Sequence, residues 1–216
     1  GVVMHNWMKG SAVEEETEEH VIVKVGAGEN WHDFVCWAID HNYGGVENLA
    51  LIPGCVGAAP VQNIGAYGVE LKDVFHKLDA YDLMNGQYFE KDHTSCAFGY
   101  RDSVFKNELK GRCCILNVYL KLTKKHSINA SYGAITTVLN ACGVNNPGIS
   151  DVAKAVIEIR SSKLPDPKKL GNGGSFFKNP VISKVQLNKL QQNFPAIVFY
   201  EIDDASVKVP AGWLID

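Results

Sequence analysis

Residues 48–68 read NLALIPGCVGAAPVQNIGAYG and hold four glycines and two prolines among twenty-one residues. A stretch of this composition cannot form a long helix or strand. Densely placed small residues let backbone amides approach a ligand closely, and successive amides can bind an anion without a charged side chain. A tight-turned surface loop is the ordinary alternative for a glycine-rich stretch. The length and apolar content of this one argue against a mere connection and favour a ligand-binding loop.

A strand and a helix are expected just before this loop. The β-branched run His20–Val25 ends at glycines and predicts a strand, and Asn30 is placed to cap a helix over Trp31–His41. Strand, glycine turn and helix in this order suggest a dinucleotide-binding Rossmann unit. The third glycine of that fingerprint would fall at Trp31, however, and an indole is too large for the close contact between helix and strand. The Rossmann interpretation therefore fails at one named position.

The rest of the chain carries short elements and one clear break. Leu164-Pro165-Asp166-Pro167 ends a helix and marks the expected domain boundary. The acidic run Glu14–Glu19 is most simply a solvated hairpin loop, with a metal site as the less favoured alternative. The further elements expected are a hairpin over Val74–Glu90 that turns at Asn85-Gly86, strands at Cys113–Leu122, Ile128–Ser131 and Ile197–Glu201, and helices over Asp151–Ser162, capped by Ser150, and over Ser183–Asn193.

Composition excludes several classes of protein. The chain has 216 residues, 46% of them apolar and 21% charged, which is typical of a soluble globular protein. A net charge of −3 offers no basic surface to a nucleic acid. No apolar run approaches the ~18 residues of a membrane span, and no signal segment opens the chain. Six cysteines without a Cys-x-x-Cys pair indicate neither zinc nor a disulfide framework and fit reduced thiols in a cytoplasm.

Several long motifs in one order resemble those of the bacterial UDP-N-acetylenolpyruvoylglucosamine reductases. The main ones are residues 48–68, Gly99-Tyr100-Arg101-Asp102-Ser103, and Gly173-Gly174-Ser175-Phe176-Phe177-Lys178-Asn179-Pro180. Three shorter pieces agree in the same order: VGAGENWH at residues 25–32, KLPDP at residues 163–167 and AGWLID at residues 211–216. The segment Ser131-Tyr132-Gly133 resembles the first type of the family, in which a tyrosine-bearing loop closes over the substrate.

The resemblance implies an α+β fold with two domains. Residues 1–163 would form an FAD-binding domain of the vanillyl-alcohol-oxidase type, and residues 164–216 a smaller α+β substrate-binding domain. It also implies an oxidoreductase that takes a hydride from NADPH onto FAD and passes it to UDP-N-acetylglucosamine enolpyruvate. The product, UDP-N-acetylmuramate, is a peptidoglycan precursor, so the implied setting is cell wall synthesis, cell shape and division in the cytoplasm. No obligate protein partner is implied.

Two catalytic residues follow from the resemblance. Hydride transfer to the enolpyruvyl alkene leaves negative charge next to a carboxylate, and that charge must be stabilised and then quenched by a proton. The serine of the Gly-Ser-Phe-Phe-Lys motif, the proton donor in the family, is Ser175 here. Arg101 matches the arginine near the flavin and the enolate. Without the motif, Ser175 would be interpreted as a turn residue and Arg101 equally well as a paired surface charge.

The resemblance also implies binding residues. The substrate contacts are Tyr100, Tyr132, Lys163, Asn179, Tyr200 and Lys208, although a lone lysine is ordinarily a solvated surface charge. The flavin contacts are Pro53, Gly54, Cys55, Val56, Gly57, Ala58, Ala59, Asn63, Ile64 and Gly65, together with Arg101. Relatives often carry serines in place of Ala58 and Ala59, so backbone amides are expected to replace those hydroxyl groups. No metal ligand is implied.

The chain departs from the family at both ends. It opens with Gly1 and closes on an apolar run, so we expect a piece of a longer reductase in which both domains are incomplete. This span is then expected to bind FAD weakly if at all, to turn over little and to be poorly soluble. Two alternatives stay open: another flavoprotein of the same fold with a different substrate, and a non-enzymatic remnant or UDP-sugar-binding module.

Overall fold

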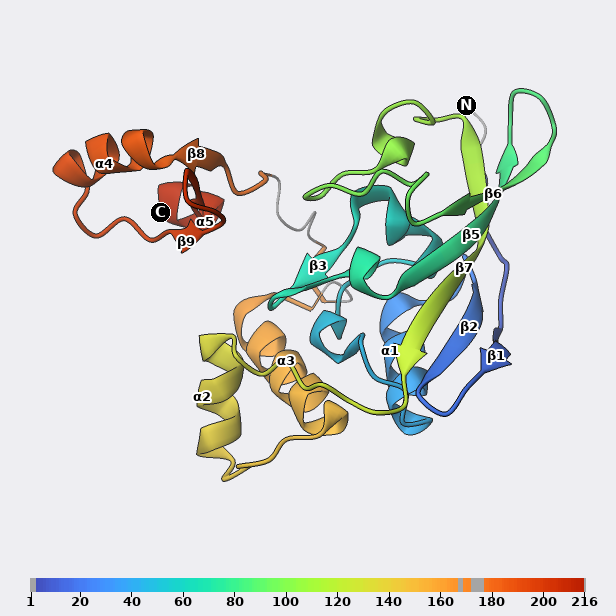
Figure 1. Ribbon diagram of the computed structural model, residues 1–216, viewed down its shortest axis with the longest axis horizontal. Coiled ribbons are helices and arrows are strands. Elements are labelled where there is room, and N and C mark those ends of the chain that lie inside the picture. The colour runs from blue at the N-terminus through green and yellow to red at the C-terminus, as the bar shows by residue number, and fades with distance from the viewer. Residues whose placement is uncertain (1–2, 167–168, 172–176, 216) are drawn as a thin grey trace. The chain divides into compact units, whose positions relative to one another are not determined.

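The computed structural model describes residues 3–166, 169–171 and 177–215 (Figure 1). The chain divides into two compact units, Gly1–Pro165 and Asp166–Asp216. The sequence placed the domain boundary after Lys163, the last residue of a helix, whereas the units divide after Pro165. Helices and strands occur together in both units, so the fold is α+β.

The larger unit is built on a five-stranded sheet with strand order β1-β2-β7-β5-β6. Every neighbouring pair in the sheet is antiparallel. An antiparallel sheet has no parallel βαβ unit, so the rejection of the Rossmann interpretation is confirmed. The strands are β1 (Ser11–Glu16), β2 (His20–Gly26), β5 (Phe75–Asp82), β6 (Tyr88–Asp92) and β7 (Cys113–Thr123).

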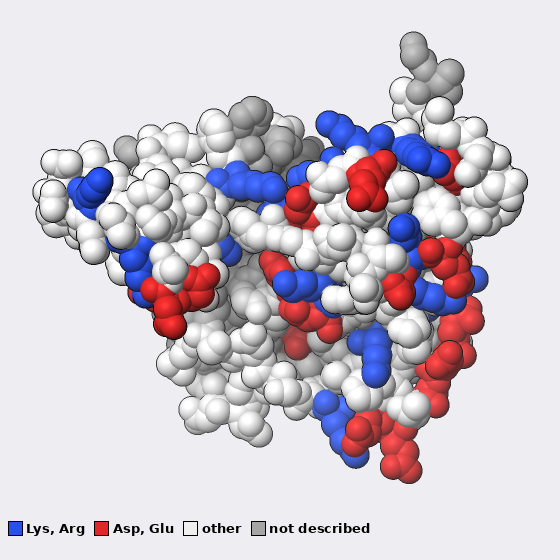
Figure 2. All heavy atoms as spheres, turned by 45° about the horizontal axis from the view of Figure 1, so that its top comes forward, with Lys and Arg blue, Asp and Glu red and all other residues white. Residues whose placement is uncertain are grey.

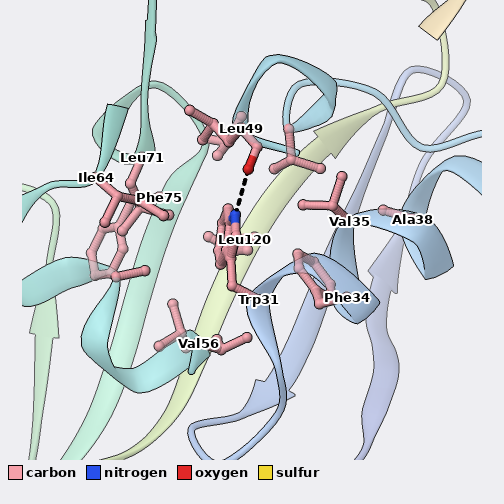
Figure 3. Packing of buried hydrophobic residues seen from close by; sticks show 14 of the residues in the cluster. Trp31, Phe34, Val35, Ala38, Leu49, Val56, Ile64, Leu71, Phe75 and Leu120 are labelled. Atoms are coloured by element: carbon pink, nitrogen blue, oxygen red, sulfur yellow. Dashed lines mark hydrogen bonds between the residues drawn. The ribbon is translucent and has the colours of Figure 1, made fainter. Parts of the chain in front are cut away.

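Helix α1 (Trp31–Asp40) packs its apolar residues into the core of the sheet (Figure 3). Asn30 caps it, because its side-chain oxygen accepts hydrogen bonds from two amides of the first turn. Trp31 is 1% exposed, and its Nε1 donates to the Leu49 carbonyl oxygen at 2.9 Å. The indole therefore ties the start of α1 to the beginning of the glycine-rich loop.

Two helices of the larger unit follow the glycine-rich loop in sequence. Helices α2 (Gly133–Ala141) and α3 (Ile149–Lys163) pack against each other, and α3 also packs against the turn Glu47–Leu49. The loop itself holds only short 3-10 turns, at Val56–Ala58 and Pro60–Gln62, followed by the two-residue strands β3 (Gly65–Ala66) and β4 (Val69–Glu70). The prediction that it forms no long regular element is confirmed.

The smaller unit has its own sheet and core. Strands β8 (Val181–Ser183), β9 (Tyr200–Glu201) and β10 (Ser206–Lys208) form an antiparallel sheet in the order β8-β10-β9. Helices α4 (Lys184–Asn193) and α5 (Ala211–Ile215) complete the unit. Its buried core consists of Leu187, Ile197, Val207 and Val209.

Several sequence expectations are wrong in detail. The helix expected from Ser150 begins two residues earlier, because Gly148 is its cap and the Asp151 carboxylate accepts the Gly148 amide at 2.9 Å. Residues 128–131 form no strand, since their carbonyls accept side-chain hydrogen bonds from Asn48 and Thr136 instead of a neighbouring strand. Strand β9 covers only Tyr200–Glu201 of the strand expected over Ile197–Glu201.

Two hairpins also differ from their expected form. The acidic run Glu14–Glu19 is not a loop throughout, because β1 extends to Glu16. This strand lies at the edge of the sheet, and an exposed edge strand tolerates carboxylates that a central strand would not. The second hairpin is present, but residues 83–87 connect β5 to β6 in place of a two-residue turn at Asn85-Gly86. Asp82 sets this longer connection, because its carboxylate accepts the Met84 amide at 2.8 Å.

Charge and hydropathy on the described surface agree with the composition. Figure 2 shows basic and acidic side chains interspersed over the visible face. Among the described residues, no helix is long and apolar enough to cross a membrane. The described part of the chain also holds no group of three metal-ligating side chains.

Candidate functional site

The predicted flavin loop is fixed to the turn that precedes α1. The Gly57 amide donates to the Ala27 carbonyl, and the Val56 amide donates to the Glu29 carbonyl, both at 2.9 Å. On the other side, the Trp31 amide donates to the Gly54 carbonyl at 3.0 Å. These bonds join two segments some thirty residues apart and hold the loop in one conformation. A rigid loop is what close approach of a ligand to backbone requires.

The loop divides into a buried half and an exposed tip. Val56 and Ala59 are buried in the core, whereas residues 53–55 are exposed. The Ala58 and Ala59 amides donate to carbonyls within their own 3-10 turn, so they are not the free donors that the sequence suggested. Among the described residues, the amides of Gly54 and Cys55 make no internal hydrogen bond. The loop therefore offers these two donors to a ligand.

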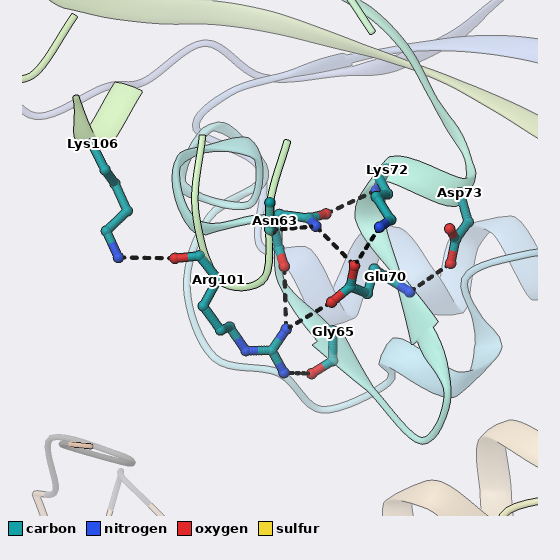
Figure 4. Close-up of polar contacts among 8 residues, drawn as sticks. Asn63, Gly65, Glu70, Lys72, Asp73, Arg101 and Lys106 are labelled. Atoms are coloured by element: carbon teal, nitrogen blue, oxygen red, sulfur yellow. Dashed lines mark hydrogen bonds and ion pairs between the residues drawn. The ribbon is translucent and has the colours of Figure 1, made fainter. Parts of the chain in front are cut away.

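Arg101 lies where the glycine-rich segment continues into β3 and β4 (Figure 4). Its guanidinium donates to the carbonyl oxygens of Asn63, at 3.2 Å, and of Gly65. Its Nη1 also lies 3.8 Å from a carboxylate oxygen of Glu70. A Cβ added at Gly65 would lie 2.7 Å from Nη1 of Arg101, so only glycine permits this approach. Residues 31 to 38 positions away in the sequence thus meet the Arg101 guanidinium.

A hollow of about 130 Å³ opens beside this cation. Predicted flavin residues form half of its lining, and among the other three Arg160 is the charged residue that the sequence analysis missed. Arg160 lies near the end of α3, where its Nε donates to the Leu51 carbonyl oxygen at 3.3 Å. A basic residue in the last turn of a helix is ordinarily explained by the helix dipole, so no sequence pattern marked Arg160 as a site residue. The lining residues are Ile52, Gln62, Ile64, Gly65, Arg101 and Arg160.

Two predicted substrate tyrosines lie in the larger unit. The Arg101 guanidinium lies 5.3 Å from the ring centre of Tyr100, within the range of a cation–π contact. Tyr132 precedes α2 as its cap residue and packs edge-on against Tyr67, with ring centres 5.3 Å apart. Since Tyr67 belongs to residues 48–68, Tyr132 contacts the glycine-rich segment directly. Lys163 is exposed at the end of α3.

The other predicted residues lie in the smaller unit or outside the described residues. Asn179 accepts the Ala211 amide at 2.9 Å through its side-chain oxygen, so it fixes the start of α5. Tyr200 and Lys208 face each other across the β9–β10 pair, and Tyr200 is exposed. Ser175, the predicted proton donor, lies outside the described residues.

Comparison with known proteins places these features in context. Residues 1–91 match the sequence profile of a family described as an FAD binding domain. UDP-N-acetylenolpyruvoylglucosamine reductases from Flavobacterium johnsoniae, Burkholderia cenocepacia and Pseudomonas aeruginosa are 50%, 48% and 46% identical to the chain over its whole length. The chain spans 64%, 62% and 63% of these three relatives, less than two thirds of each.

One solved structure shares the fold. The crystal structure of UDP-N-acetylenolpyruvylglucosamine reductase from Thermus caldophilus matches with a TM-score of 0.53 and 24% sequence identity. The match covers 73% of this chain and 48% of that one. At this level of identity the likeness shows a common fold, and that fold is α+β as expected.

Proposed function

Because the chain is related over its whole length to the UDP-N-acetylenolpyruvoylglucosamine reductases, we propose that the protein it belongs to reduces UDP-N-acetylglucosamine enolpyruvate to UDP-N-acetylmuramate. FAD is the proposed cofactor and NADPH the hydride donor. The larger unit is proposed to hold the flavin and the smaller one to bind substrate. The single observation that carries the proposal is the identity of about half of all residues to enzymes of one name across the full chain.

The larger unit fits a flavin dinucleotide. The exposed loop tip offers the free amides of Gly54 and Cys55, which suit a phosphate or a flavin carbonyl. No atom lies within 4 Å of a Cβ built at Gly54, so that point of the loop is open. The hollow lined by Arg101 and Arg160 lies in the same unit and adds positive charge there. Glycine, free amides and arginine are the donor set that a dinucleotide with a pyrophosphate requires.

Arg101 is the residue proposed to stabilise charge during the reaction. FAD, when bound, would supply the hydride that is added to the enolpyruvyl group. The addition develops negative charge on the carbon next to the substrate carboxylate. A guanidinium already held by carbonyls needs little reorganisation to stabilise that charge, and this preorganisation lowers the barrier. Ser175 is proposed to donate the proton that completes the reduction.

The tyrosines and polar residues are proposed to hold the UDP-sugar. Tyr132 lies on the segment before α2 and already contacts Tyr67 through its ring, so a small movement of that segment would bring its hydroxyl toward a diphosphate. Tyr100, Lys163, Asn179, Tyr200 and Lys208 are the other proposed substrate contacts. The substrate is a water-soluble nucleotide sugar, and we place the reaction in the cytoplasm, in the peptidoglycan synthesis on which cell shape and division depend.

Equilibrium binding followed by turnover tests the proposal. The purified chain is titrated into FAD, and quenching of flavin fluorescence gives a dissociation constant even where binding is weak. NADPH is then added without oxygen, and UDP-N-acetylglucosamine enolpyruvate after it. The expected result is saturable binding, bleaching near 450 nm and recovery of that band with the UDP-sugar. Arg101→Met should weaken flavin binding, whereas Arg112→Met, which removes the ion-pair partner of Asp82 in the same unit, should not.

Two outcomes would favour the alternatives. Flavin binding and bleaching by NADPH without recovery by the UDP-sugar would indicate a flavoprotein with another substrate. Binding of the UDP-sugar, measured by calorimetry, without any binding of FAD would indicate a nucleotide-sugar-binding module.

A further inference from the structure

Asn63 was predicted to contact the cofactor, but its polar groups are engaged inside the protein. The residue is 0% exposed. Its side-chain nitrogen donates at 3.0 Å both to a Glu70 carboxylate oxygen and to the Gly99 carbonyl. Its side-chain oxygen accepts the Lys72 amide at 3.0 Å. Both amide protons are therefore used, and the side chain has no donor left for a ligand.

The backbone of Asn63 is engaged as well. Its carbonyl oxygen accepts from Nη1 of Arg101, and its amide donates to the Pro60 carbonyl at 3.3 Å. Its φ of 42° lies in the left-handed region, where asparagine is tolerated better than most residues. Asn63 thus contacts the turn that carries Arg101 at two points, the Gly99 carbonyl and the Arg101 guanidinium.

Glu70 completes this arrangement from the other side. One of its carboxylate oxygens accepts from Asn63 and pairs with the Lys72 ammonium at 3.1 Å. The other oxygen faces Nη1 of Arg101 at 3.8 Å. Both Glu70 and Arg101 are about three quarters buried, so their attraction is screened less than at an open surface. The carboxylate therefore draws the guanidinium toward the Gly65 carbonyl.

The turn that carries Arg101 needs such support. Arg101 has a φ of 54°, a conformation that costs of the order of what a single hydrogen bond contributes. Gly99 and Asp102 bond to each other across the turn, and the Lys106 ammonium donates to the Arg101 carbonyl at 3.0 Å. The contact of Asn63 with the Gly99 carbonyl anchors the first residue of the same turn.

We propose that Asn63 and Glu70 are positioning residues, which fix the direction of the Arg101 guanidinium before any ligand arrives, and that Asn63 does not bind the cofactor through its side chain. The proposal deepens the function proposed above and rests on it for the role of Arg101. The position of Arg101 itself can be tested without any cofactor.

The arginine content of the chain makes a direct test possible. The chain has three arginines, Arg101, Arg112 and Arg160, so nitrogen NMR of the guanidinium groups gives few signals. The Arg101 signal is the one that disappears in the Arg101→Lys variant. Exchange of the Arg101 guanidinium protons with water is measured in the ligand-free chain. Glu70→Gln keeps an acceptor for Asn63 but removes the charge, and should speed exchange up to about fivefold. Asn63→Gly keeps the left-handed backbone, removes the anchor and should speed exchange about tenfold.

Two controls separate positioning from general loosening. Arg112, bound to Asp82 at the far end of β5, is an internal reference whose exchange should not change in either variant. Glu90→Gln removes an ion pair with Lys77 between β5 and β6 and should leave the Arg101 signal unchanged. Unaltered exchange at Arg101 in Glu70→Gln and Asn63→Gly would overturn the proposal, as would equal acceleration at Arg112.

FAD binding then distinguishes this proposal from the function. Asn63→Gly in an Arg101→Met background should bind FAD as Arg101→Met does, because Asn63 is expected to act only through Arg101. A further loss in the double variant would mean that Asn63 contacts the cofactor itself and would refute that part of the proposal. If the chain binds no FAD while the Arg101 guanidinium protons still exchange faster in Glu70→Gln and Asn63→Gly, the result would support the positioning role and refute the flavin-binding function.

Discussion

Replacing Gly57 by alanine should distort the proposed flavin loop at a defined point. A Cβ at Gly57 would lie 2.6 Å from the Ala27 Cβ and 3.1 Å from the Ala27 carbonyl oxygen. Neither of these two Ala27 atoms can rotate away, because the Ala27 amide is bound to the Leu116 carbonyl in β7 at 2.8 Å. Backbone must therefore move, and overpacking of this kind costs about 1–3 kcal/mol.

Thermal unfolding checks this value. For a protein of this size each kcal/mol shifts Tm by about 2–4 °C, so Gly57→Ala should lower Tm by roughly 2–12 °C. Gly133→Ala is the matched control, because no atom lies within 4 Å of its added Cβ and the residue begins α2. That variant should unfold at the wild-type temperature or slightly above it. Equal Tm values for the two variants would refute the claim that the loop is held against Ala27 by close backbone contact.

Three further predictions concern capping, pH and thiol reactivity. Asn30→Ala should lower the unfolding free energy by about 1 kcal/mol in urea titrations, because two amides at the start of α1 lose their acceptor. The Arg112 guanidinium holds the pKa of the Asp82 carboxyl below its ordinary value. The Asp82→Asn variant should therefore be less stable than wild type at pH 7. This difference in stability should shrink as the pH falls below about 3.9, the pKa of Asp in the unfolded chain, and should vanish below the lower pKa of Asp82 in the folded protein. Burial raises the pKa of Cys96 to about 12, so a disulfide reagent at pH 8 should modify exposed Cys142 in the folded protein and Cys96 only after unfolding.

Local signals predicted the regular elements well. The Asn30 cap and the helical spacing of apolar residues predicted α1, a β-branched run ending at glycines predicted β2, the Asn-Gly hairpin signal predicted β5, and alternation predicted β7. These signals succeed because capping and periodicity depend on residues within a few positions of each other. The one-residue argument at Trp31 also held, since its indole fills the core where a third glycine would have been needed.

The errors arose where a distant partner overrides local preference. Residues 128–131 were expected to form a strand, but no neighbouring strand pairs with them, and the Asn48 side chain, some eighty positions away, donates to one of their carbonyls. The hairpin between β5 and β6 was expected to turn at Asn85-Gly86, yet the Asp82 carboxylate, held by Arg112, fixes a longer connection. Such contacts leave no periodic trace in the sequence.

The sequence by itself determined the irregular glycine-rich loop, the elements around it and, through its motifs, the family that the chain resembles. Only the tertiary structure decided what each polar residue of that region does. It buried Asn63 behind Arg101, brought Glu70 to the same guanidinium and placed Arg160 at the rim of the hollow. The physical reason is that hydrogen bonds and ion pairs act over a few ångströms of space, and the fold alone brings residues 36 to 109 positions apart within that range.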